Sequence, residues 1–128
     1  MIAASELILN PDGSVYHINL KPGQVANDII FVGDQNRVEK ITRNFDSIEF
    51  STQKREFKTQ TGTYKGKRIT VMSSGIGPDN IDIVMNELDA LVNVDLATRT
   101  VKKELTSLNI VRIGTSGSLQ ADIPCDSF

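Results

Sequence analysis

The chain has 128 residues, of which 39% are hydrophobic and 23% are charged, and its formal net charge at pH 7 is -2. This composition is typical of a globular protein with one core, and it excludes a strongly basic surface for nucleic acid. No apolar run approaches the roughly 18 residues of a membrane span, the first residues do not resemble a signal peptide, and a single cysteine excludes an internal disulfide, so we expect a cytoplasmic protein.

Three segments are predicted as strands that end in glycine-containing loops. They cover residues 28–33, 67–75 and 109–114, and each is rich in Val, Ile or Phe without clean alternation. That pattern is typical of strands buried on both faces, as in a parallel sheet.

Helical patterns lie between these strands. Apolar residues recur at spacings of three and four after the first strand, and Asp34 is the predicted N-cap of that helix. A second helix is predicted over residues 77–92, with Pro78 in its first turn. A third helix is predicted over residues 96–108, leading into the last strand.

The remaining region predicts antiparallel strands. Residues 50–64 nearly alternate between polar and apolar, and Lys65-Gly66 is a predicted turn. Strands alternating with helices indicate an α/β fold with a mainly parallel sheet, in which ligands bind at the carboxyl ends of the strands. We expect residues 1–128 to form a single domain that continues in a larger protein, because a strand and loop end the chain without a covering helix.

The glycine loops after the three strands could together form a polar floor for an anion. Glycine lets the backbone adopt positive φ and lets a ligand approach bare N–H groups. The alternative is that each glycine simply makes a turn, since none of these loops matches the Walker A pattern or GxGxxG.

Two arginines sharpen the anion hypothesis. Arg37 lies in the first turn of the first predicted helix, and Arg112 lies between two apolar residues of the third strand. A buried guanidinium is costly unless it is paired, so Arg112 should meet either a carboxylate or a bound anion. Thr115 supplies a hydroxyl just beyond it.

His17 and Cys125 are weaker candidates. A lone histidine is more often structural than functional, and there is no His or Cys cluster to complete a zinc site. Cys125 would need a nearby base to act as a nucleophile, and the sequence indicates none.

Five motifs in order resemble one family. The segments "VYHINL", "VGDQNRVEKI", "KREF", "SSGIG" and "RIGTSGSLQ" are similar to the amino-terminal half of nucleoside phosphorylases of the uridine phosphorylase type. The resemblance covers residues 16–122 and implies part of a three-layer α/β fold with a mixed, mainly parallel sheet. It also implies phosphorolysis of a nucleoside to free base and ribose 1-phosphate.

The resemblance implies a role for each matching residue. Asp34 would organise the loop of the "GDxxR" motif, where Gln35 replaces the usual proline, and His17 would contact the ribose, as would Thr115. Ser116 and Gly117 would line the base pocket. The implied phosphate-binding residues are Gly33, Arg37, Arg55, Arg112 and Thr115.

The resemblance also implies partners. His17 and Arg55 would be lent across a subunit interface, so we expect a homo-oligomer built from dimers and reaching a hexamer. Inorganic phosphate is the implied co-substrate, with no metal or organic cofactor and no nucleic acid or membrane partner. Glu56 matches a position that holds a monovalent cation in some members, but the loop after Gly77 differs from theirs, so the presence of that ion stays open.

More than one substrate and more than one activity are compatible with the resemblance. Uridine, and hence pyrimidine salvage, is favoured over a purine nucleoside, and a nucleosidase that uses water is disfavoured by the three arginines. A truncated or degenerate paralogue that binds an anion without catalysis is the alternative outside enzymes, because the family's second half carries most base and ribose contacts. We therefore expect the 128-residue chain alone to be inactive.

Overall fold

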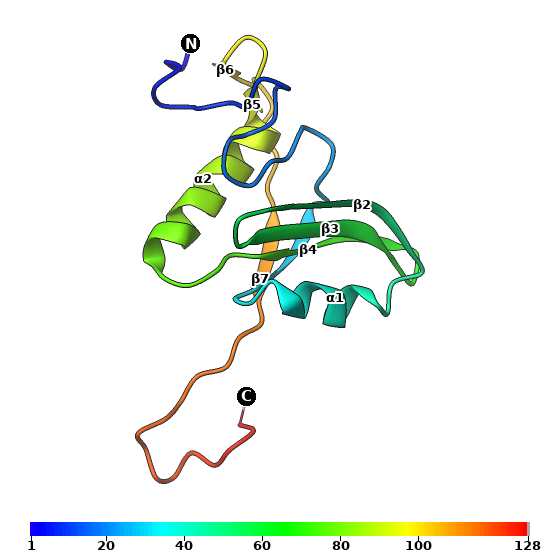
Figure 1. The fold of residues 1–128 in the computed structure, drawn as a ribbon, viewed down its shortest axis with the longest axis vertical. Coiled ribbons are helices and arrows are strands. Elements are labelled where there is room, and N and C mark those ends of the chain that lie inside the picture. The colour runs from blue at the N-terminus through cyan, green and yellow to red at the C-terminus, as the bar shows by residue number, and fades with distance from the viewer. Residues whose placement is uncertain (128) are drawn as a thin grey trace.

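The computed structural model describes residues 1–127, which form one five-stranded sheet, two helices and a small two-stranded sheet (Figure 1). The two helices are α1 (Asn36–Thr42) and α2 (Pro78–Asn93). The strands in chain order are β1 (Asp28–Val32), β2 (Ser47–Lys54), β3 (Phe57–Tyr64), β4 (Lys67–Ser73), β5 (Val94–Asp95), β6 (Thr100–Val101) and β7 (Asn109–Arg112).

The large sheet is mixed, with the order β2-β3-β4-β1-β7. β1 pairs in parallel with β4 and with β7, whereas the β2–β3 and β3–β4 pairs are antiparallel. The predicted α/β fold and the turn at Lys65-Gly66 are confirmed. The large sheet has as many antiparallel as parallel strand pairings, whereas a mainly parallel sheet was predicted. The hairpin connection β2–β3 and the turn before β4 account for the antiparallel half.

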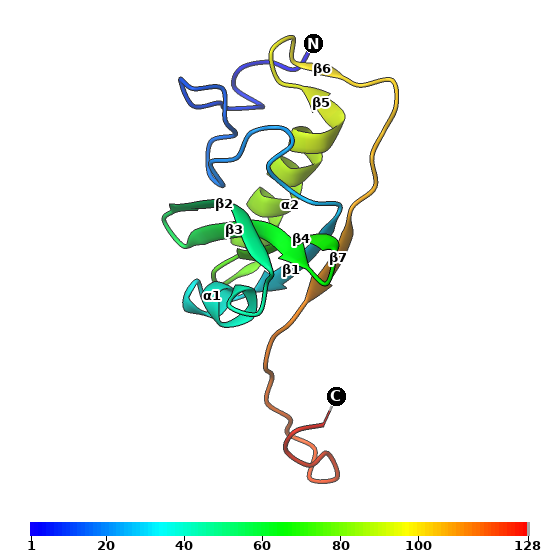
Figure 2. The ribbon, with the colours of Figure 1, turned by 90° about the vertical axis from the view of Figure 1, so that its right-hand side faces the viewer.

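The two helices cover opposite faces of the sheet, because β1 alternates its side chains between them (Figures 1 and 2). Ile29 and Phe31 belong to the main core, which also contains buried side chains of α2 and of the amino-terminal segment. Val32 packs in the smaller cluster with Val38 of α1. In this three-layer arrangement, α1 follows the carboxyl end of β1 and α2 follows the carboxyl end of β4.

The third predicted helix is wrong. Residues 96–108 contain β6 and irregular backbone, and β5 and β6 form a short antiparallel pair. The Asp95 carboxylate accepts hydrogen bonds from the N–H groups of Ala97 and Thr98, at 2.9 and 3.1 Å. Such local bonds offer the backbone a turn in place of a helix.

The strand β7 differs from the prediction of a strand buried on both faces. It lies at the edge of the sheet, and Val111 and Ile113 beside Arg112 are 61% and 43% exposed. Within residues 1–127 only β1 pairs with it. Arg112 is therefore exposed rather than buried.

No helix within the described residues is long and apolar enough to cross a membrane.

Candidate functional site

The carboxyl ends of β1, β4 and β7 lie at one edge of the sheet, as the parallel pattern predicted, and this edge brings together the first two glycine loops and the start of the third. The N–H of Gly75 donates to the carbonyl of Gly33 at 3.0 Å, which joins the first two loops. The N–H of Ile113 donates to the carbonyl of Phe31 at 2.8 Å, which holds the third loop beside the first. The shared edge is the first requirement for one anion site.

A cleft of about 800 Å³ opens at this edge, and we call it the arginine cleft. It draws its walls from the β1–α1 loop, the β2–β3 turn, the β4–α2 loop and the end of β7. Its lining residues are Gly33, Asp34, Gln35, Arg55, Glu56, Gly75, Ile76, Gly77, Asn80 and Arg112.

Arg112 folds its guanidinium back over two glycines. A Cβ added to Gly114 would lie 2.7 Å from Nη1, and one added to Gly33 would lie 3.8 Å from Nη2. Among residues 1–127, no carboxylate oxygen lies within 4.0 Å of this guanidinium. Arg112 was expected to meet either a carboxylate or a bound anion, and residues 1–127 supply no carboxylate. The five N–H donors of its guanidinium are therefore available to an anion.

Arg55 reaches the same cleft from the tight turn between β2 and β3. Its backbone has a φ of 54°, a left-handed conformation that costs a residue with a side chain about 1 kcal/mol or more. Like Arg112, it makes no ion pair within the described residues. An exposed, strained arginine at a cleft is typical of a functional position.

The neighbouring turn and loop hold each other in place. The amide of Asn80 donates to Glu56 at 3.0 Å and to the carbonyl of Ile76 at 3.1 Å. Gly75 has a φ of 69°, and a Cβ there would lie 2.6 Å from Nδ2 of Asn80 and 2.7 Å from Cγ of Glu56. Only glycine fits this close approach without displacing a neighbour.

Asp34 organises the start of α1, although it is not the N-cap itself. The N-cap is Gln35, while the Asp34 carboxylate accepts the N–H of Asn36 at 2.9 Å and its carbonyl accepts the N–H of Arg37 at 3.0 Å. The N-cap thus lies one residue later than predicted, although Gln35 itself has helical backbone angles. Arg37 is half-buried and does not line the arginine cleft.

Thr115, Ser116 and Gly117 lie outside the cleft. They follow β7 in an exposed, extended segment that runs away from the sheet (Figure 1). In this chain the Thr115 hydroxyl, expected just beyond Arg112, therefore does not line the cleft.

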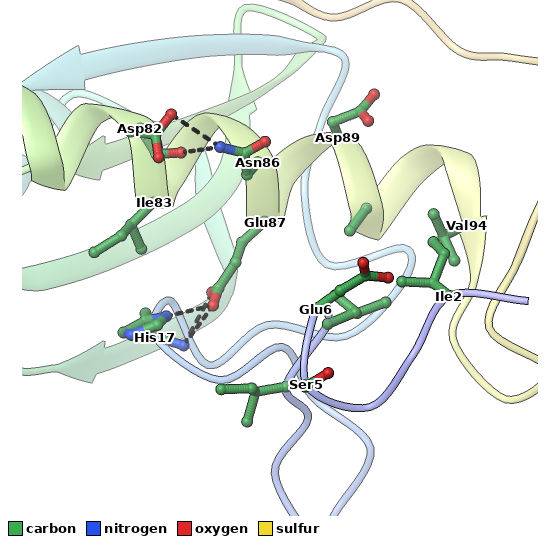
Figure 3. Close-up of a pocket in the computed structure, with 13 residues that line it drawn as sticks. Ile2, Ser5, Glu6, His17, Asp82, Ile83, Asn86, Glu87, Asp89 and Val94 are labelled. Atoms are coloured by element: carbon green, nitrogen blue, oxygen red, sulfur yellow. Dashed lines mark hydrogen bonds and ion pairs between the residues drawn. The ribbon is translucent and has the colours of Figure 1, made fainter.

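His17 lies in a different cavity of about 390 Å³, between the amino-terminal segment and α2, which we call the His17 pocket (Figure 3). Its ring Nδ1 lies 2.6 Å from Oε1 of Glu87. The same carboxylate accepts the backbone N–H of His17 at 2.9 Å and that of Ile18 at 2.8 Å. Within one chain, His17 and the arginine cleft are separate sites.

Sequence reasoning missed two of these positions. Asn80 carries no sequence signal that distinguishes it from other helix residues. Glu87 had one, because it falls three residues after Val84 and four before Leu91, on the apolar face of α2, where a carboxylate needs a partner. Within residues 1–127, no group of three or more His, Cys, Asp and Glu side chains could hold a metal ion.

Comparison with known proteins identifies relatives. A family model described as the phosphorylase superfamily matches residues 28–128. A uridine phosphorylase from Thermococcus kodakarensis is 36% identical over 112 residues, and a DeoD-type purine nucleoside phosphorylase from Streptococcus suis is 38% identical over 109 residues. These alignments cover 88% and 84% of this chain, but only 35% and 40% of the relatives.

Solved structures agree with these relatives. A Trypanosoma brucei nucleoside phosphorylase, which shows uridine phosphorylase activity, superposes with a TM-score of 0.83 at 38% identity, covering 92% of this chain and 41% of that one. A uridine phosphorylase from Phytophthora capsici gives a TM-score of 0.77 at 29% identity, covering 96% of this chain and 38% of that one. The chain thus spans about two fifths of the length of the proteins that it matches.

Proposed function

The chain belongs to the phosphorylase superfamily, and from this membership we propose that it is the amino-terminal part of a nucleoside phosphorylase. The reaction is phosphorolysis: an oxygen of inorganic phosphate attacks the anomeric carbon, the glycosidic bond breaks, and free base and ribose 1-phosphate leave. Residues 1–128 belong to a single domain that this chain does not complete. Its contribution is the phosphate site.

One observation carries this proposal: Arg112 and Arg55 line a single glycine-walled cleft, and within residues 1–127 neither guanidinium group makes an ion pair. Planar guanidinium groups bind phosphate oxygens through pairs of charge-assisted hydrogen bonds. Bound there, the dianion is oriented and partly desolvated before it attacks, and the arginines stabilise the charge that separates as the bond to the base loosens. No step needs a metal or an organic cofactor.

The other phosphate residues join this site once the anion and the rest of the domain are in place. Gly33 offers a bare backbone beside Arg112, and Asp34 holds the loop that Arg37 follows. Thr115 approaches the phosphate and ribose, and Ser116 and Gly117 face the base, when the segment after β7 is packed. These roles rest on the family resemblance of the motifs.

His17 completes the active site of a second copy in this proposal. It is remote from the arginine cleft of its own chain and its pocket is open, which supports a role in trans. Arg55 is exposed at a turn and can serve either its own cleft or a neighbour's. The proposed assembly is a cytoplasmic homo-oligomer built from dimers, with the hexamer as its full form.

Uridine is the proposed substrate, and a purine nucleoside is the second candidate. The motifs favour uridine, and the T. brucei relative shows uridine phosphorylase activity. The purine candidate is favoured by DeoD-type relatives of equal similarity, at 38% identity against 36%.

Release of free base from uridine and from inosine, with and without phosphate, tests the proposal in the full-length protein. Phosphate-dependent release of uracil supports uridine phosphorolysis, and phosphate-dependent release of hypoxanthine alone selects the purine candidate. Release without phosphate would indicate a nucleosidase. No release, together with binding of phosphate, would indicate a non-catalytic anion-binding paralogue.

A further inference from the structure

The buried carboxylate of Glu87 is contacted by three groups, namely the backbone N–H groups of His17 and Ile18 and the ring Nδ1 of His17. Its residue is only 9% exposed, and both oxygens accept N–H groups from the loop that carries His17 (Figure 3). An ionised carboxylate can only accept hydrogen bonds. The ring Nδ1 of His17, at 2.6 Å, must therefore donate.

A neutral imidazole carries its proton on one nitrogen only, so a donor at Nδ1 leaves Nε2 as an acceptor. The ring is also fixed in orientation, because Tyr16 packs edge-on against it with a centroid distance of 4.9 Å. Tyr16 is in turn held by Lys54, whose ammonium lies 4.1 Å from the centre of its ring. The His17 loop is therefore held from both sides, by α2 and by β2.

We propose that Glu87 is a positioning residue that makes Nε2 of the neutral His17 ring a hydrogen-bond acceptor, so that in this form of the ring the His17 pocket selects a ligand group that donates. Given the proposed function, on which this inference rests, that group is the primary hydroxyl of a nucleoside bound to a second copy. An ether oxygen in its place offers only lone pairs, and these would face the lone pair of Nε2.

The substitution Glu87→Gln tests this inference because it exchanges the donor and acceptor nitrogens of the His17 ring. The backbone N–H groups of His17 and Ile18 can never accept a hydrogen bond, so the amide oxygen must face them. The amide NH₂ then faces Nδ1, and the ring responds by moving its proton to Nε2. An amide oxygen in the Oε2 position keeps one hydrogen bond from each of the two backbone N–H groups, so the variant should fold.

The first readout needs no activity. In the full-length protein at mildly alkaline pH, ¹⁵N chemical shifts of the neutral imidazole report the tautomer of His17, whose signals are identified as those that disappear in His17→Gln. We expect the Nδ1–H form in the wild type and the Nε2–H form in Glu87→Gln. An Nε2–H form in the wild type, or the same tautomer in both proteins, would overturn the inference.

The second readout is substrate preference. We expect the wild type to prefer a nucleoside over its 5′-O-methyl ether, and Glu87→Gln to reduce that ratio of kcat/KM by about tenfold, the effect of one hydrogen bond gained or lost. Steric effects of the methyl group cancel because the same pair of substrates is compared. A switched tautomer with an unchanged ratio would overturn the selection of a donating group.

Two controls separate this inference from its alternatives. Asp79→Asn makes the same carboxylate-to-amide change in the first turn of α2, where Asp79 is exposed and does not line the His17 pocket, so it should alter neither readout. In the double variant with His17→Gln, Glu87→Gln should have no further effect on the ratio, whereas a merely structural Glu87 would add its effect. Absence of all nucleoside turnover would contradict the proposed function, while the tautomer would still decide the role of Glu87.

Discussion

The arginine cleft and the His17 pocket differ in how their charged side chains are partnered. Arg112 and Arg55 have no carboxylate within reach among the described residues, whereas His17 is held by the buried carboxylate of Glu87. Cations without an ion-pair partner are suited to an external anion, because no internal ion pair must be broken when it binds. A paired imidazole is instead suited to a neutral group whose hydrogen-bond polarity matters.

The largest expected effect comes from Arg112→Ala. Losing a paired set of charge-assisted hydrogen bonds should weaken phosphate use, seen as kcat/KM for phosphate in the full-length protein, by about a hundredfold. The free energy of unfolding should hardly change, because the guanidinium is exposed and has no partner within residues 1–127. Arg43→Ala, an exposed arginine at the end of α1, is the matched control and should leave phosphate use unchanged. Wild-type affinity for phosphate in Arg112→Ala would refute the assigned role.

Gly75→Ala tests whether the floor of the cleft depends on close packing. The new Cβ must displace Asn80 or Glu56 and keep a φ of 69°, so urea unfolding should show a loss of about 2 kcal/mol. Gly66→Ala, with a φ of 78° but nothing within 4 Å of the added Cβ, carries only the backbone strain and should lose about 1 kcal/mol. Equal losses in the two variants would show that the packing around Gly75 contributes nothing.

Arg55→Gly should separate stability from function at the edge of the cleft. Glycine adopts a φ of 54° without strain, so the protein should gain about 1 kcal/mol in urea unfolding while its phosphate affinity falls. Arg55→Ala removes the same guanidinium but keeps the strain, so it should lose affinity without gaining stability. A gain of equal size in both variants would assign the stability change to the side chain rather than to the backbone.

The smallest effect concerns the loop that carries His17. Hydrogen bonds from the hydroxyl and N–H of Ser14, with an ion pair to Lys21, lower the pKa of Asp12 from 3.8 to about 2. Because the folded pKa is the lower one, Asp12 stabilises the fold fully above pH 3.8 and loses this contribution as the pH falls towards 2. The urea midpoint of Asp12→Asn should therefore lie below that of the wild type at neutral pH and meet it at the acid end. A difference that does not vary with pH would contradict this account.

The sequence by itself determined the elements whose pattern is local. Periodicity and glycine chemistry predict the buried strands β1 and β4, the apolar stripe of α2 and the turn at Lys65-Gly66. Because each glycine loop follows the carboxyl end of a predicted parallel strand, the sequence also implied that the loops share one edge of the sheet. The motifs around these loops were also sufficient to indicate the family, which the family model confirms.

Only the tertiary structure decided which side chains meet. The Asp95 carboxylate turns the backbone where residues 96–108 carried a helical pattern, and the edge position of β7 leaves Arg112 exposed despite its apolar neighbours. The pairing of His17 with Glu87 joins residues 70 positions apart. No local pattern encodes such a contact, because it depends on how α2 packs against the amino-terminal segment rather than on spacing along the chain.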